Sequence, residues 1–185
     1  LLRTNRKNSF REDLQILSIN RKHIMQSQSN NTGDLLQKSI GINIQKSQVG
    51  GGSPNLRGME ANRILLIVDG VKMNNIIYRS GHLQNIMTID PFSLNKIGVG
   101  NGLSSVVYGS GALGGVILIE TIKPFKTDSS EFFFSQQIES ASDAVLGHFH
   151  AKYGKNKFHF LSGLTFKSFG NSKMGGKRLH GYQNW

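Results

Sequence analysis

The residues Arg63-Ile64-Leu65-Leu66-Ile67-Val68-Asp69-Gly70 carry the strongest structural signal in this chain of 185 residues. Five consecutive apolar residues are typical of a strand that is buried on both faces. The Asp-Gly pair that follows them favours a tight turn. A second apolar run, Val116-Ile117-Leu118-Ile119, follows a cluster of glycines between positions 109 and 115. We therefore predict two buried strands within one compact α+β domain over residues 32–122.

Around these strands the pattern predicts shorter elements. Thr32 is a suitable N-cap for a helix, and Gly41 is a suitable end, because glycine readily adopts the left-handed conformation. Between them lies an apolar stripe made of Leu35, Leu36 and Ile40. Residues 42–45 alternate like a strand with one buried face, and the glycine-rich residues 50–54 are predicted to form a loop. The Asp-Pro pair at 90–91 predicts the start of a short helix.

Residues 1–31 are polar and weakly patterned. We predict an extended arm, then a strand near residues 14–19, then a short helix that runs through Ile24 and Met25. Asn20 is positioned to cap this helix.

Residues 131–169 show an alternation of period two, in three segments of about 10 residues each. In the first segment Phe132, Phe134 and Ile138 share one face. In the second, Val145, Gly147, Phe149, Ala151 and Tyr153 alternate with Leu146, His148, His150 and Lys152; in the third, Phe158, Phe160, Leu164 and Phe166 alternate with His159, Gly163, Thr165 and Lys167. Residues 154–157 are predicted to be the turn between the second and third segments. A soluble β-sandwich also alternates, but aromatic-rich strands of this length with short turns favour crossing a bilayer.

The composition excludes several kinds of site and anchor. The chain has no cysteine, which excludes disulfides, thiolate metal sites and cysteine nucleophiles. No stretch approaches the ~18 apolar residues of a spanning helix, although a membrane-crossing strand has a much weaker signature. The net charge is +11, but the Lys and Arg residues are mostly scattered. This distribution favours solvated surfaces over a nucleic-acid-binding domain, which is kept as an alternative.

One motif points to an enzyme. Gly109-Ser110-Gly111-Ala112-Leu113-Gly114 matches the G-x-G-x-x-G of dinucleotide sites, where a following helix holds the pyrophosphate at its N-terminus. Residues 115–119 look like a strand and not a helix. The glycines before them are therefore better explained by tight turning and close backbone approach. A nucleotide-binding oxidoreductase is therefore an alternative that a helix over residues 115–121 would support. An adhesin-like β-protein is another, and it would lack a helix over 32–39.

Other reactive side chains favour structural roles. His148 and His150 share one side of a strand, but a metal site would need a third ligand that the sequence does not identify. We interpret them as polar residues on the wet face of the strand. Asp69 fits turn chemistry. Arg57 and Arg63 flank the start of a strand, where ion pairs or hydrogen bonds to carbonyls are expected. We assign no catalytic residue, no metal and no cofactor.

Four blocks in the middle of the chain resemble the plug domain of TonB-dependent outer-membrane receptors. Each block is weak alone, but together and in this order they are specific. The blocks are Asp34-Leu35-Leu36-Gln37 to Gly41-Ile42-Asn43-Ile44, Asn55-Leu56-Arg57-Gly58 to the Arg63–Gly70 stretch, Ser104-Ser105-Val106-Val107-Tyr108-Gly109-Ser110, and Gly111-Ala112-Leu113-Gly114-Gly115-Val116-Ile117-Leu118-Ile119. Residues 79–85 are also similar to a subgroup of these receptors from Bacteroidetes-type bacteria.

The chain departs from the family pattern at three places. Ile40 stands where proline usually precedes the glycine, and residues 101–103 replace an Arg-Gly-Pro-like turn. Gly98 occupies a position where an acidic residue is common. These departures leave the expected fold unchanged, but the chain lacks the Arg and the acidic residue that would make a plug–barrel ion pair.

The resemblance implies an N-terminal fragment with three parts. Residues 1–31 are the N-terminal arm and start of the plug, residues 32–122 are the plug core, and residues 123–185 are the first three or so barrel strands. The expected fold class is an α+β plug domain, with a small mixed sheet and short helices, followed by antiparallel transmembrane β-barrel strands of an incomplete barrel. Open sheet edges and a lipid-facing apolar surface also predict low solubility.

By the same resemblance, the protein lies in the cell outer membrane with the plug inside the barrel lumen, and it imports an iron–siderophore, haem or cobalamin. The implied partners are outer-membrane lipid, a small-molecule ligand such as a metal chelate, and TonB, which would bind an N-terminal box that we do not identify; no nucleic acid is expected. Tyr78, Arg79 and His82 are the candidates for ligand binding. Structural roles in the plug motifs are expected for Arg57, Gly58, Arg63, Asp69, Gly70, Tyr108, Gly109, Gly111, Gly114 and Gly115.

Overall fold

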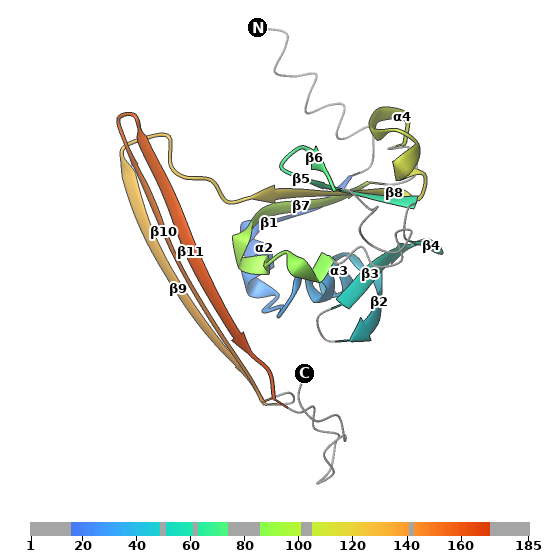
Figure 1. Ribbon diagram of the computed structural model, residues 1–185, viewed down its shortest axis with the longest axis horizontal. Coiled ribbons are helices and arrows are strands. Elements are labelled where there is room, and N and C mark those ends of the chain that lie inside the picture. The colour runs from blue at the N-terminus through green and yellow to red at the C-terminus, as the bar shows by residue number, and fades with distance from the viewer. Residues whose placement is uncertain are drawn as a thin grey trace, which may run out of the picture. The chain divides into compact units, whose positions relative to one another are not determined.

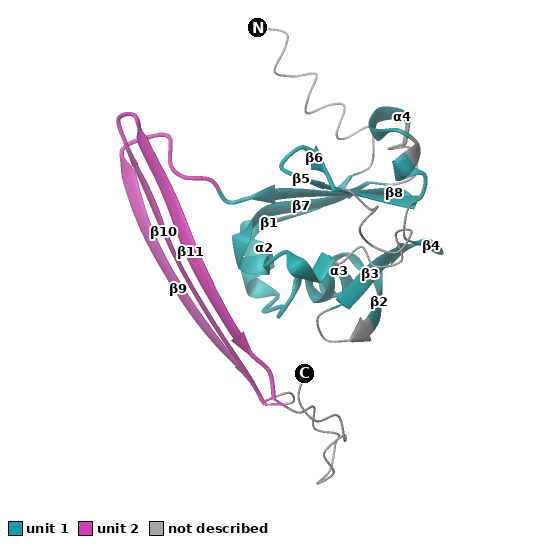
Figure 2. Ribbon diagram, viewed as in Figure 1, with its two compact units in different colours: residues 1–122 teal, residues 123–185 magenta. Residues whose placement is uncertain are grey.

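The structure is a computed structural model that describes residues 16–48, 51–60, 63–73, 86–100, 105–140 and 143–170. The chain divides into two compact units, residues 1–122 and residues 123–185 (Figure 2). In the described residues, the first unit combines short helices with two sheets, whereas the second is a single antiparallel sheet. This arrangement confirms the predicted fold class of a mixed sheet with short helices followed by antiparallel strands.

A five-stranded mixed sheet forms the centre of the first unit (Figure 1). Its strands run in the order β1 (Leu17–Asn20), β7 (Leu94–Gly100), β8 (Gly115–Thr121), β5 (Ile64–Val68) and β6 (Val71–Lys72). β5 and β8 pair in parallel with Ile64 opposite Gly115, and the other neighbours pair antiparallel. The two apolar runs are therefore adjacent strands of this sheet, which confirms both predicted buried strands.

Helix α2 (Arg21–Gln26) follows β1 directly. Asn20 is its N-cap, because the Asn20 side chain accepts a hydrogen bond from the His23 backbone N–H at 3.2 Å. This contact confirms the predicted cap. The Arg21 guanidinium donates to the Leu94 carbonyl at 2.8 Å, which ties the helix to the start of β7.

Helix α3 (Thr32–Ile40) begins one residue earlier than predicted. The predicted cap at Thr32 is wrong, because the Asn31 side chain accepts the capping hydrogen bond from the Asp34 N–H at 2.8 Å. Thr32 is buried instead, and its hydroxyl donates to the Ile89 carbonyl at 2.5 Å. Gly41 ends the helix in the left-handed conformation, with φ of 74°, as predicted. A helix here also contradicts the all-β alternative.

A second sheet in this unit contains β2 (Asn43–Gln48), β3 (Gly51–Leu56) and β4 (Met59–Glu60). The loop predicted over residues 50–54 is wrong, because residues 51–54 belong to β3 and are buried. A Cβ on Gly52 would overlap the Met87 methyl group, so glycine here permits close packing and does not mark a turn. Pro54 is tolerated, because β4 pairs only with the last two residues of β3.

Short helical segments complete the first unit. They are η4 (Ile86–Thr88), η5 (Pro91–Ser93), α4 (Ser105–Tyr108) and η7 (Ser110–Ala112). The short helix predicted at residues 90–91 is observed as η5. Asp90 makes no side-chain capping bond to it, but the Ser93 N–H and hydroxyl both donate to the Asp90 carbonyl, at 3.0 and 2.7 Å.

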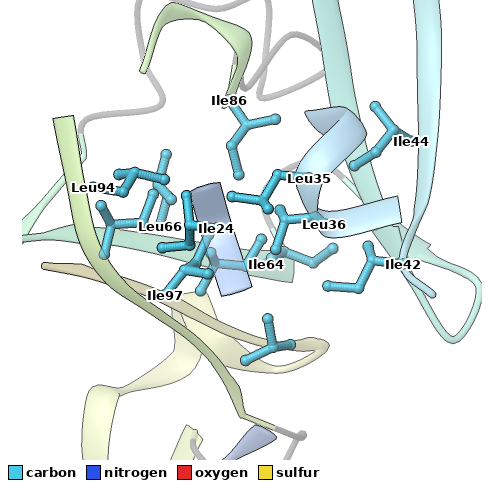
Figure 3. Packing of buried hydrophobic residues seen from close by; sticks show 13 residues of the cluster. Ile24, Leu35, Leu36, Ile42, Ile44, Ile64, Leu66, Ile86, Leu94 and Ile97 are labelled. Carbon is cyan, nitrogen blue, oxygen red and sulfur yellow. The ribbon is translucent and has the colours of Figure 1, made fainter. Parts of the chain in front are cut away.

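The main core of this unit combines side chains from the five-stranded sheet and from helices α2 and α3 (Figure 3). Its 13 buried residues are Ile24, Leu35, Leu36, Ile42, Ile44, Ile64, Leu66, Ile86, Leu94, Ile97, Val99, Ile117 and Ile119. A smaller cluster contains Leu65, Ile67, Ala112 and Val116. Alternate residues of β5 thus enter different clusters, so this strand is buried on both faces, which is why its sequence is continuously apolar.

The second unit is an antiparallel sheet of β9 (Ser129–Glu139), β10 (Ala144–Lys155) and β11 (Phe158–Ser168), with β10 in the middle. Strands of 11 or 12 residues have the length that crosses a bilayer at a tilt. The turn predicted over residues 154–157 is shorter, because Gly154 and Lys155 still pair within β10. Asn156, with φ of 52°, has the left-handed backbone of a two-residue hairpin turn. None of the helices in the described ranges is long and apolar enough to cross a membrane.

Candidate functional site

The glycines at the start of β8 allow a close backbone approach between neighbouring segments of the first unit. The Gly114 N–H donates to the Arg63 carbonyl at 2.6 Å. A Cβ on Gly114 would lie 2.7 Å from the Met59 Cβ. Gly115 has φ of 142°, and a Cβ there would lie 2.6 Å from the Gly100 carbonyl oxygen. Only glycine therefore lets β8 pass between β5 and β7 at this point.

The turn after β5 is tied to the far end of β8. Asp69 and Gly70 both have left-handed backbone, with φ of 49° and 88°. The Asp69 carboxylate accepts hydrogen bonds from the Thr121 N–H at 3.1 Å and from the Thr121 hydroxyl at 2.5 Å. The Asp69 N–H donates to the Ile119 carbonyl at 2.8 Å. Asp69 thus shapes the turn and joins it to the end of β8, the strand adjacent to β5.

Replacement of Asp69 by alanine is expected to lower the free energy of unfolding of the first unit by about 1–2 kcal/mol. Alanine loses both side-chain hydrogen bonds and tolerates the left-handed backbone poorly. Denaturant unfolding followed by circular dichroism measures the change. Asp69→Asn is the matched control, because asparagine tolerates this backbone and still accepts from the Thr121 N–H. An equal loss in both variants would contradict this role.

The other plug-motif residues lie at turns and short helices. Arg57 and Gly58 form a tight turn with left-handed backbone, φ of 53° and 78°. The Asn55 side chain accepts from the Gly58 N–H at 3.1 Å. The Tyr108 carbonyl accepts from the Lys72 ammonium at 2.6 Å, which links α4 to β6.

The arrangement after Gly114 contradicts the enzyme alternative. Residues 115–121 form strand β8, so no helix N-terminus is available there to hold a pyrophosphate. Gly109 has φ of 96°, whereas Gly111 lies in the short helix η7 with ordinary space around it. These glycines therefore allow the backbone to follow its tight path into β8.

The ligand-binding candidates Tyr78, Arg79 and His82 lie within residues 74–85, outside the described residues. Their role remains a prediction. Within the described ranges, no group of three or more His, Asp and Glu side chains could hold a metal ion.

A chain of hydrogen bonds crosses one face of the β9–β11 sheet. His148 Nδ1 lies 2.7 Å from the Thr165 hydroxyl, and His148 Nε2 lies 3.0 Å from His150 Nδ1. His150 Nε2 lies 3.2 Å from Glu131 Oε1, which also accepts from the Lys152 ammonium at 2.6 Å. One polar network therefore joins all three strands.

The two histidines are buried, with exposures of 4% for His148 and 0% for His150. Their interpretation as residues on a wet face is therefore wrong. β10 has a strand on each side, and the Phe133 ring stacks on the His150 ring with centroids 4.9 Å apart. Glu131 and Lys152 were not predicted as functional residues, because their pairing depends on the register between β9 and β10. One signal in the sequence could have linked Lys152 to the histidines: His148, His150 and Lys152 are spaced two residues apart, which places them on one face of a strand.

The chemistry of the partners sets the direction of this network. A carboxylate only accepts, so His150 Nε2 carries the proton that faces Glu131. In a neutral His150 the Nδ1 atom then accepts from the His148 Nε2–H, and His148 Nδ1 accepts from the Thr165 hydroxyl. One added proton is accommodated if the Thr165 hydroxyl turns to accept. A second added proton would place the His148 Nε2–H and the His150 Nδ1–H opposite each other, which is unfavourable.

The opposite face of the same sheet is apolar and exposed. It carries Phe132, Phe134, Ile138, Val145, Phe149, Tyr153, Phe158, Phe160, Leu164 and Phe166. The predicted apolar face is thus confirmed. A sheet that is polar on one face and apolar on the other matches the strands of an outer-membrane barrel, whose outer face meets lipid.

Comparison with known sequences points to one family. Residues 11–116 match the profile of the TonB-dependent Receptor Plug Domain. The chain is 30% identical over 119 residues to a hemin receptor of Yersinia enterocolitica, covering 64% of this chain and 17% of that protein. It is 37% identical over 92 residues to the vitamin B12 transporter BtuB of Vibrio vulnificus, covering 48% of this chain and 14% of that protein.

Solved structures share this fold. The copper transporter OprC matches with a TM-score of 0.72 and 20% identity, over 89% of this chain and 25% of that one. The ferric yersiniabactin uptake receptor FyuA of Yersinia pestis matches with a TM-score of 0.61 and 18% identity, over 83% of this chain and 24% of that one. The chain thus spans about a quarter or less of the proteins that it resembles.

Proposed function

This chain belongs to the family of TonB-dependent receptor plug domains, and we propose that the whole protein is an outer-membrane receptor that imports a scarce ligand. One observation carries this proposal: the plug unit ends at Ile122 and leads directly into three strands with one polar and one apolar face. We propose that the plug lies inside the barrel lumen and that the apolar face contacts outer-membrane lipid. An iron–siderophore, haem or cobalamin is the proposed cargo, which the names of the hemin and vitamin B12 relatives support.

The plug sheet suggests where the import cycle begins. In the proposed cycle, TonB adds a strand to a box in the N-terminal arm and pulls on it. β1 is the first described strand after the arm, and it lies at the edge of the sheet, held to β7 by four residue pairs. An edge strand with few contacts opens at lower free energy than central strands. Pulling is therefore expected to release β1 before it disturbs β5 and β8.

Growth on a single ligand source tests this proposal. The full-length protein is expressed in a Gram-negative host that lacks its own receptors, and haem, a ferric siderophore and cobalamin are supplied in turn. We expect growth with one of the three, and loss of that growth when the host lacks TonB. Growth that does not depend on TonB contradicts the proposal. So does a failure of the cells to grow on any of the three ligands when the protein is found in their outer membrane.

Simultaneous replacement of Tyr78, Arg79 and His82 by alanine is expected to weaken ligand binding at least tenfold. An aromatic ring, a cation and an imidazole suit an anionic chelate or haem, and ligand contacts of this kind each contribute on the order of 1 kcal/mol or more. Calorimetry with the detergent-solubilised full-length protein and the ligand found by growth measures the change. The exposed pair Lys22→Ala and Lys38→Ala is the control. Unchanged affinity in the triple variant would remove these residues from the site.

Membership of the Bacteroidetes-like subgroup rests on residues 79–85 alone and stays a prediction. Phylogenetic placement of the full-length sequence checks it, and grouping with receptors of other bacteria would contradict it.

A further inference from the structure

We propose that the β10–β11 turn end of the second unit binds anionic phospholipid headgroups through Lys126, Lys155 and Lys157. This surface rests on the proposed function, because it requires the three strands to lie in a membrane. All three lysines are exposed. Residues 125–128 and 154–159 that position them are called the basic rim here.

Several contacts hold the two halves of the basic rim together. The His159 ring nitrogen Nδ1 lies 2.6 Å from the Phe125 carbonyl oxygen, and the Asn156 N–H donates to the Asp128 carboxylate at 3.1 Å. Gly154 lies so close to residues 125–127 that a Cβ there would be 2.5 Å from the Phe125 carbonyl oxygen. The segment before β9, which contains Lys126, therefore lies against the turn between β10 and β11.

The charge at this end is strongly positive. Lys126, Lys155 and Lys157 lie in the basic rim with one acid, Asp128, which already accepts a hydrogen bond from the turn. Lys152 is set apart, because it is nearly buried and its ammonium pairs with Glu131. The described residues at the opposite end of the strands carry Glu139, Asp143 and Lys167, which is a net negative charge. The described part of the sheet is therefore electrically asymmetric along its strands.

The depth of the basic rim matches the headgroup layer. Tyr153, Phe158 and Phe160 are exposed on the apolar face at the same end, with exposures of 43%, 79% and 57%. Aromatic rings gather at the level of the headgroups, and lysines extend their ammonium groups from there toward water and phosphate. The two-residue turn is typical of the periplasmic end of outer-membrane barrels. Phospholipid phosphate at that leaflet is therefore the proposed occupant, in preference to the lipid A of the outer leaflet.

Native mass spectrometry of the full-length protein in detergent micelles tests this surface. Dioleoyl-phosphatidylglycerol, dioleoyl-phosphatidylcholine and lipid A are the probes, each at the same concentration. We expect phosphatidylglycerol to be retained preferentially, and Lys155→Gln with Lys157→Gln to weaken its binding by roughly 25-fold, since each lysine contributes about fivefold. Lys22→Gln with Lys38→Gln removes the same charge from exposed sites in the first unit and is expected to leave binding unchanged.

Three results would overturn the inference: equal binding of the two phospholipids, a preference for lipid A, or an equal loss in the control variant. Failure of the proposed function is recognised separately, because the protein would then not fractionate with the outer membrane. If the protein is embedded in the membrane but shows no headgroup preference, only the inference about the basic rim is contradicted.

Discussion

Replacement of Gly115 by alanine is expected to destabilise the plug by about 3–5 kcal/mol, which is a large share of the roughly 5–15 kcal/mol that holds a typical domain folded. The φ of 142° is strained for any residue with a Cβ. The added methyl group would also lie 2.6 Å from the Gly100 carbonyl oxygen and would overlap the Leu56 side chain. Because the first contact is to backbone, β7 and β8 would have to separate locally.

Gly111→Ala is the matched control for this prediction, since it adds the same methyl group within the same glycine cluster. A Cβ on Gly111 would meet only Leu65 Cδ1, at an ordinary 3.7 Å, and its backbone is not left-handed. We expect its effect to stay within about 1 kcal/mol. Denaturant unfolding and protease resistance of both variants measure the difference. Similar stability of the two variants would show that Gly115 is not required for the backbone path into β8.

Replacement of Glu131 by leucine is expected to lower the free energy of unfolding of the full-length protein by about 2–4 kcal/mol. The change leaves the Lys152 ammonium and the His150 N–H without their shared acceptor in a buried position. Removal of one partner of a buried ion pair typically costs 3–5 kcal/mol. The lower range applies here, because the Glu131 side chain is 40% exposed and water replaces part of the lost contact.

A double-mutant cycle separates this effect from general damage to β9. Glu131→Leu combined with Lys152→Met removes both charges, so we expect the double variant to be more stable than the sum of the two single losses by about 1–2 kcal/mol. Ser135→Ala, on the same face of β9, is the control and is expected to have little effect. Additive losses in the cycle would indicate that the Glu131–Lys152 pair contributes nothing specific.

Much of the plug was predictable because its signals are local. The apolar run at 64–68 and the Asp69–Gly70 turn need only neighbouring residues to be recognised. The same holds for the Asn20 cap and for the left-handed Gly41 that ends α3. The structure confirms these elements.

The predictions that proved wrong concern residues whose structure depends on a residue far away in the sequence. Residues 51–54 look like a loop, but the Met87 side chain packs against Gly52 and makes this glycine-rich segment a buried strand. Thr32 is as good a cap as Asn31 by residue type, but the Ile89 carbonyl, 57 residues away, takes its hydroxyl. Neither neighbour can be identified from spacing along the chain.

The amino-acid pattern by itself determined which residues form the buried strands of the plug and which side of β9–β11 is apolar. Both follow from periodicity, since side chains alternate across a strand whatever surrounds it. Only the tertiary structure decided what the polar side does, because the cross-strand hydrogen bonds His148–Thr165 and His150–Glu131, of about 3 Å, exist only in one register of three strands. A shift of a single residue in that register would separate both of these cross-strand pairs.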